Sequence, residues 1–202
     1  MPPSNKRLND LLLSADFSNE IDDLPPPGTF IGKKFQTPKE IQKELDRARE
    51  TKEAEFRRWL IKNKPHNALM TPIETSTVAG VPDIYCCYNS FSSWIECKVL
   101  VMGSVRFRGT QYSYLKKLIT AGGNAKIVVQ RLNKTSYKPA SISIYDAAKI
   151  VTMPFGLFKK VGQDLIFPVG TEPDYTWSYT KDKDKLPDLY QRLLLDTEDF
   201  TW

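Results

Sequence analysis

Apolar residues recur at helical spacing in the first third of the chain and predict one long helix. They fall on one face: Ile41, Leu45, Ala48, Phe56 and Leu60. Thr37 suits the N-cap and Pro38 the first helical position, whereas Pro65 cannot continue a helix. We therefore expect a helix from about Pro38 to Asn63.

The pattern then changes to short apolar runs of the kind that form strands. Residues 68–78 predict a strand or an extended segment. Residues 83–88 and 93–101 are rich in strand formers and are separated by NSFSS, which predicts a hairpin.

Helical and strand patterns alternate through the second half. Residues 110–121 are amphipathic and end at two glycines, which is typical of a helix C-terminus. Residues 125–130 predict a buried strand, and residues 141–150 predict another strand and a short helix. A last helix is expected near Leu186–Leu195. This order predicts an α/β fold, with a small mixed central sheet flanked by helices.

Composition divides the chain into three predicted parts. Residues 1–36 contain PPPG and are expected to form a flexible N-terminal arm. Residues 37–153 hold the regular patterns and form the predicted core. Residues 154–202 are rich in aromatic and turn residues and form a C-terminal extension of unknown role.

Charge is unevenly distributed along the 202 residues, whose formal net charge is +5. Basic residues crowd 33–64 and 98–138, and acidic residues cluster near 16–23 and 196–199. The basic middle favours a polyanionic partner, although a solubilising surface explains it equally well. A solvated helix face is expected for four residues of this basic middle, Arg57, Arg58, Lys62 and Lys64.

The sequence argues against membrane insertion and against a cysteine-based site. No stretch approaches ~18 consecutive apolar residues, and the N-terminus has no apolar signal-peptide core. We therefore expect an intracellular, cytoplasmic protein with no membrane partner. Cys86, Cys87 and Cys97 make an odd count without CxxC spacing, so neither zinc binding nor a disulfide framework is indicated.

Candidate chemistry lies in residues 80–98, GVPDIYCCYNSFSSWIECK. Residues two apart in a strand point to the same face, so Glu96 and Lys98 are expected side by side. Pairing of the two strands would bring Asp83 close to Glu96, and their carboxylates would repel unless a cation lay between them. Alternatively, the Glu-x-Lys pair is a solvated sheet edge with no function.

Oxygen ligands of this kind favour Mg²⁺, for which Mn²⁺ may substitute. Asp83, Glu96 and the backbone carbonyl of Cys97 are the predicted ligands. Lys98 would orient the attacking water or balance the charge of a phosphate. The set is suited to hydrolysing a phosphodiester.

This arrangement resembles the PD-(D/E)xK nuclease superfamily, and most closely its VRR-NUC and Holliday-junction-resolvase-like branches. The matching residues are Gly80, Pro82 and Asp83 for the first motif, Glu96 and Lys98 for the second, and Gln111 for the glutamine that opens the next helix. The resemblance covers residues 50–130 and implies a restriction-endonuclease-like core. It implies that the two acids bind metal, that the lysine assists the attacking water, and that the glutamine steadies the site or contacts DNA.

The family also carries an acid on the preceding helix, and this chain offers two. Glu53 shares a face with Phe56 and Leu60 and can reach the sheet, whereas Glu55 points about 160° away by helical geometry. We prefer Glu53, with a solvated acid as the alternative for either.

Phosphate contacts are expected around this site. The candidates precede the GVPD turn or follow the ECK strand: Ser76, Thr77, Arg106, Arg108, Lys116 and Lys117. Each is also explained as an ordinary turn or surface residue. The Tyr and Trp residues at 175–179 are expected as a hydrophobic cover or dimer surface rather than a base-stacking surface.

We therefore expect a Mg²⁺-dependent endodeoxyribonuclease that acts on branched or structured DNA. Junction resolution needs two symmetric cuts and predicts a homodimer. The small size fits a phage or mobile-element enzyme in a bacterial or phage-infected cytoplasm. The alternatives are a flap or nicking nuclease, a non-catalytic DNA-binding protein on a nuclease fold, and an interaction protein with an accidental motif.

Overall fold

The computed structural model describes residues 37–74, 77–100, 105–133, 138–167 and 171–195. The predicted arm, residues 1–36, lies outside these ranges. The chain divides into two compact units, residues 1–51 and residues 52–202.

The first unit contains the early turns of helix α2 (Pro38–Lys62). The Thr37 backbone N–H donates to Glu40 Oε2 at 2.7 Å, and the Glu40 N–H donates to Thr37 Oγ1 at 3.3 Å. This reciprocal capping satisfies two amides that the first turn leaves without a partner. It confirms the predicted start of the helix.

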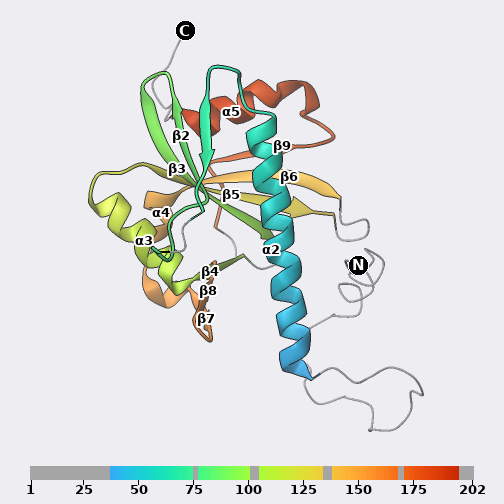
Figure 1. Ribbon diagram of the computed structural model, residues 1–202, viewed down its shortest axis with the longest axis vertical. Coiled ribbons are helices and arrows are strands. Elements are labelled where there is room, and N and C mark those ends of the chain that lie inside the picture. The colour runs from blue at the N-terminus through green and yellow to red at the C-terminus, as the bar shows by residue number, and fades with distance from the viewer. Residues whose placement is uncertain (1–36, 75–76, 101–104, 134–137, 168–170, 196–202) are drawn as a thin grey trace, which may run out of the picture. The chain divides into compact units, whose positions relative to one another are not determined.

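The second unit is built on a mixed six-stranded sheet (Figure 1). Its strands follow the order β1 (Leu69–Pro72), β2 (Ile84–Tyr88), β3 (Phe91–Leu100), β5 (Ala125–Leu132), β6 (Pro139–Asp146) and β9 (Tyr175–Ser178). Only β3 and β5 run parallel among these neighbouring pairs. The sheet with its helices confirms the predicted α/β class.

Helices α3 (Gly109–Thr120) and α4 (Ala147–Thr152) pack with β5 around one apolar cluster, which includes Leu115, Ile127 and Ile150. A second sheet joins this cluster, in the order β4 (Arg106–Arg108), β8 (Asp164–Ile166) and β7 (Lys159–Val161). The 3-10 turns are η1 (Phe155–Leu157) and η2 (Lys183–Lys185). No helix in these segments is long and apolar enough to cross a bilayer.

The β2–β3 hairpin is tighter than the sequence suggested. Strand β3 begins at Phe91 rather than at Ser93, and the turn consists of Asn89 and Ser90 alone. Both residues have positive φ, 47° and 67°. Two such residues match the twist of the flanking strands, so the pairing continues directly to Phe91.

Residues beyond 153, which the sequence marked as an extension of unknown role, add strand β9 to the central sheet. They also supply helix α5 (Leu186–Leu194), which contacts β2 and β3. The buried Tyr190 hydroxyl donates to the Leu60 carbonyl at 2.6 Å. This bond ties α5 to the last turns of α2.

We expect Tyr190→Phe to lower the free energy of unfolding by about 1–2 kcal/mol, because it deletes a buried hydrogen bond and leaves little other change. Tyr114→Phe is the control, since its hydroxyl makes no hydrogen bond with a described residue. Urea unfolding of the two variants measures the difference. Equal stabilities would show that the contact does not hold α5 in place.

Candidate active site

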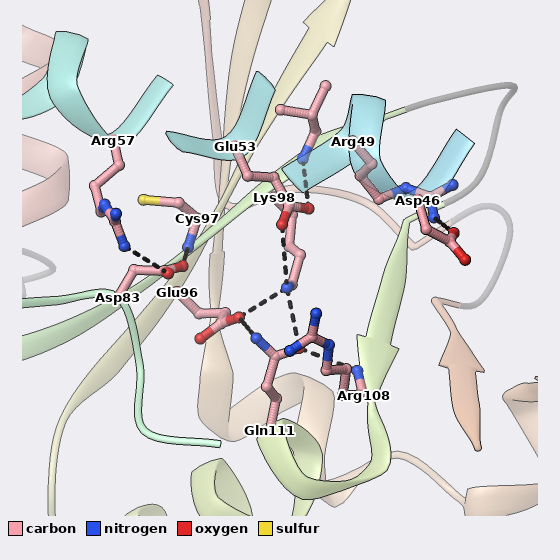
Figure 2. A network of polar contacts seen from close by, with 11 residues as sticks. Asp46, Arg49, Glu53, Arg57, Asp83, Glu96, Cys97, Lys98, Arg108 and Gln111 are labelled. Atoms are coloured by element: carbon pink, nitrogen blue, oxygen red, sulfur yellow. Dashed lines mark hydrogen bonds and ion pairs between the residues drawn. The ribbon is translucent and has the colours of Figure 1, made fainter. Parts of the chain in front are cut away.

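The site forms where strand β2 stops pairing with β3. The ladder between them ends at Ile95, although β3 continues to Leu100. Backbone amides two apart point to the same side of a strand, so the amides of Cys97 and Val99 face the vacated side. The Cys97 N–H donates to Asp83 Oδ2 at 2.8 Å, and the Val99 N–H donates to Glu53 Oε1 at 3.4 Å (Figure 2). Two carboxylates thus replace the missing strand.

Lys98 lies at the centre of a side-chain network (Figure 2). Its Nζ is 2.8 Å from Glu96 Oε1 and 3.1 Å from Gln111 Oε1. Glu53 Oε2 lies 3.8 Å from the same Nζ. Gln111 also donates from Nε2 to Glu96 Oε1 at 2.6 Å. The structure therefore brings together residues from α2, β3 and α3 that the sequence singled out.

Burial excludes the solvated-edge alternative for the Glu-x-Lys pair. Glu96 is 0% exposed and Lys98 is 3% exposed. Strand β3 lies third in the six-stranded order, and β5 pairs with it at both positions. Charged side chains are rarely buried in this way unless they are paired or bind a ligand.

The local charges make this network short of positive charge. Burial raises the pKa of Glu96 to about 8; Lys98 lowers it by attraction, and Asp83 and Glu53 add repulsion. Burial alone would lower the pKa of Lys98, but Glu96 and Glu53 more than offset this effect and leave that pKa raised. Two cations, Lys98 and Arg57, thus stand among three acids.

The residues present fit a divalent cation. Glu96 Oε2 is buried and has no hydrogen-bond partner among the described residues. An orphaned carboxylate oxygen beside a second acid is a ready ligand for a hard cation. No three His, Cys, Asp or Glu side chains within the described ranges are grouped to hold an ion by themselves. Mg²⁺ commonly takes only one or two carboxylates, so the set suits it. The Cys97 carbonyl stays a predicted ligand.

Helix α2 presents one of its two candidate acids to the network. Glu53 contacts β3, whereas Glu55 pairs with Lys52 at 2.8 Å and is exposed. Arg57 lies one turn after Glu53, with NH1 3.4 Å from Asp83 Oδ1. The side chain of Arg57 is 22% exposed, so its assignment to a solvated face was wrong. Arg57 lies four residues after Glu53 and so shares its face of the helix, and this spacing is the sequence signal that could have identified it.

The predicted phosphate contacts lie in different surroundings. Arg106 is partly buried and lies 3.9 Å from Asp164. Arg108, Lys116 and Lys117 are exposed on the strand end and helix that carry Gln111. Thr77 is exposed, and Ser76 lies outside the described residues.

Gly80 explains how the GVPD turn reaches this helix. Its φ is +88°, and a Cβ at this position would lie 2.3 Å from the Thr110 carbonyl oxygen and 2.8 Å from the Gln111 nitrogen. Only glycine permits this approach. The turn before Asp83 is therefore packed directly against the helix turn that carries Gln111.

No family model and no curated protein matches this chain. Among solved structures, it is similar to Hjc, a Holliday junction resolvase from the archaeal hyperthermophile Archaeoglobus fulgidus. The identity is 12% and the TM-score 0.40, over 58% of this chain and 84% of that chain. A likeness at this level carries no argument about function, which rests on the geometry above.

Gly80→Ala is expected to destabilise the fold and to disturb the contacts of Gln111. Gly122→Ala is the matched control, because Gly122 has a similar φ of +82° but no atom within 4 Å of the added Cβ. Strain at positive φ costs about 1–3 kcal/mol in either variant, and the collision adds to it only at Gly80. Equal melting temperatures for the two variants would contradict the close contact.

The bond from Cys97 to Asp83 predicts different effects for two substitutions of that acid. Asp83→Asn keeps an oxygen that accepts the amide hydrogen, whereas Asp83→Ala leaves the amide without its partner. We expect the alanine variant to be less stable than the asparagine variant by about 1–3 kcal/mol in urea unfolding. Identical values would show that the carboxylate does not support the strand.

Proposed function

We propose that this chain is an endonuclease that hydrolyses phosphodiester bonds in DNA with Mg²⁺ as its cofactor. The observation that carries this proposal is the buried Glu96 carboxylate, whose Oε2 has no partner among the described residues while its Oε1 is held by Lys98 and Gln111. One oxygen is fixed by the protein, and the other is left for a ligand.

The residues that would hold the ion are Asp83 and Glu96, with the Cys97 carbonyl as a further ligand. When bound, Mg²⁺ supplies Lewis-acid polarisation of a phosphate and lowers the pKa of a water molecule. The pair of acids supplies negative charge that attracts the cation, and the burial of Glu96 strengthens that attraction.

Lys98 contributes a fixed positive charge next to these acids. Two of its donors are directed by Glu96 and Gln111, so its position is set before a substrate arrives. A prepositioned cation stabilises the charge that develops on a phosphate during cleavage. Gln111 acts as a positioning residue, since it contacts both members of the Glu-x-Lys pair.

A DNA substrate is supported by the exposed basic residues on the adjoining elements. Arg108 precedes α3, and Lys116 and Lys117 lie further along that helix. Their charges suit a phosphate backbone. Action on branched DNA and a homodimeric, junction-resolving assembly are the finer parts of the proposal, and they rest on the resemblance of the motifs.

A non-catalytic DNA-binding protein on the same scaffold is the second candidate. It is favoured by Arg57, whose guanidinium lies near Asp83 and neutralises part of its charge without any ion. Arg57 pairs with Asp83 and provides no partner for the unpaired Oε2 of Glu96, and for that reason we prefer the enzyme.

Cleavage of a DNA panel tests the proposal. Four-way junction, 5′ flap, 3′ flap, plain duplex and single strand are incubated with Mg²⁺ or Mn²⁺. We expect metal-dependent cleavage that Lys98→Met reduces by about 10²–10³-fold, the scale of losing one charge-stabilising donor.

Lys126→Met is the matched control, because Lys126 is also buried and faces an acid, Asp146, at 3.8 Å. It should retain cleavage. Good DNA binding without cleavage of any substrate by the wild type would support the second candidate instead. Absence of salt-sensitive DNA binding would oppose both.

A further inference from the structure

A cleft of about 900 Å³ lies beside helix α3, on the side of the β7–β8 hairpin. Figure 1 shows these strands next to α3, and β8 contacts that helix. The basic and aromatic residues of its lining are Lys116 and Lys117 from α3, Lys160 from β7, and Tyr112 and Phe155. The sequence had marked only the two α3 lysines, as phosphate contacts.

The cleft carries positive charge without compensation. No Asp or Glu contributes to its lining. Lys116, Lys117 and Lys160 are exposed, and none forms an ion pair within the described part of the chain. Three like charges around one hollow repel each other, and a polyanion relieves that repulsion. The volume lies within the range of ligand-sized clefts.

The aromatic ring of Phe155, at this cleft, is supported by two buried rings. Phe155 is 57% exposed. Its ring centroid lies 6.1 Å from that of Tyr112 and 6.4 Å from that of Phe158. Both of these rings are buried, so Phe155 has fixed support while much of it faces solvent. A supported, exposed ring suits stacking with a nucleobase.

The cleft adjoins the candidate active site through α3. Gly109 and Tyr112, which line it, flank the helix turn that holds Gln111. Lys116 lies five residues after Gln111, about 7.5 Å along the helix axis and about 140° around it, so the two side chains leave different faces of α3. A DNA strand that passes Gln111 would reach the cleft by crossing the N-terminal turn of α3, where Gly109 lines the cleft.

We propose that this cleft binds an unpaired DNA strand that continues from the cleaved phosphodiester around the N-terminal turn of α3, with the three lysines on its phosphates and Phe155 stacked on a base. Stacking on a side chain requires a base that is free of its duplex neighbours, and for this reason a flap, gap or open junction arm fits better than paired DNA. The proposal rests on the proposed nuclease function and narrows its substrate to DNA with a single-stranded segment.

The test measures binding of the full-length protein in EDTA, so that no cleavage contributes. Fluorescence anisotropy compares a duplex that carries a single-stranded arm with a fully paired duplex of the same length. We expect Phe155→Ala to weaken binding of the armed duplex about tenfold, the scale of losing one stacked base, and to leave binding of the paired duplex nearly unchanged.

A triple variant tests the charges. The variant combines Lys116→Ala, Lys117→Ala and Lys160→Ala. For the armed duplex, the slope of log affinity against log salt concentration should decrease in magnitude by about two, since each single-strand phosphate contact contributes ~0.7 to this slope. The matched control removes Lys181, Lys183 and Lys185, which are exposed and lie outside the cleft lining. This control should reduce the magnitude of the slope less than the cleft variant does.

Equal losses on armed and paired duplexes would overturn the single-strand assignment, and so would unchanged affinity in the Phe155 variant. Thermal melts confirm that each variant is folded. Because binding is read without metal, the outcome is separable from the nuclease proposal: a wild type that binds the arm through Phe155 but cleaves nothing keeps the cleft and loses the enzyme. If the wild type cleaves DNA and the cleft variants bind it normally, the nuclease proposal stands and the cleft proposal is rejected.

Discussion

The unpaired side of strand β3 is the constraint on which this structure depends. A strand inside a sheet needs a partner for every amide, and β2 leaves before β3 ends. The amides of Cys97 and Val99 are satisfied by Asp83 and Glu53 instead. Two acids of the candidate site, Asp83 and Glu53, are thus placed by the hydrogen-bonding needs of the backbone.

The same arrangement concentrates charge where the fold least favours it. Glu96 and Lys98 are buried on β3, and three acids stand against the two cations Lys98 and Arg57. Close packing holds them there, through the contact of Gly80 with α3 and the two hydrogen bonds of Gln111. The fold tolerates a local electrostatic cost that stability alone would remove, which is the usual mark of a functional site.

Much of this could be predicted from the sequence, because the signals were local. Period-two alternation placed Glu96 beside Lys98, and helical spacing favoured Glu53 over Glu55. Arg57 was missed because its partner, Asp83, lies far away in the chain, although its position one turn after Glu53 was a local signal. Strand β9 was missed for a similar reason, since four residues carry little periodicity and their place is set by pairing with β6.

The double role of the carboxylates has a consequence for which substitutions the site tolerates. The backbone needs only an acceptor at each position, and an amide side chain would serve it as well as an acid. The negative charges of Asp83 and Glu53 meet a different need, because Arg57 and the buried Lys98 face them. An amide at either position would therefore keep the sheet edge satisfied and remove one counter-charge from a basic side chain.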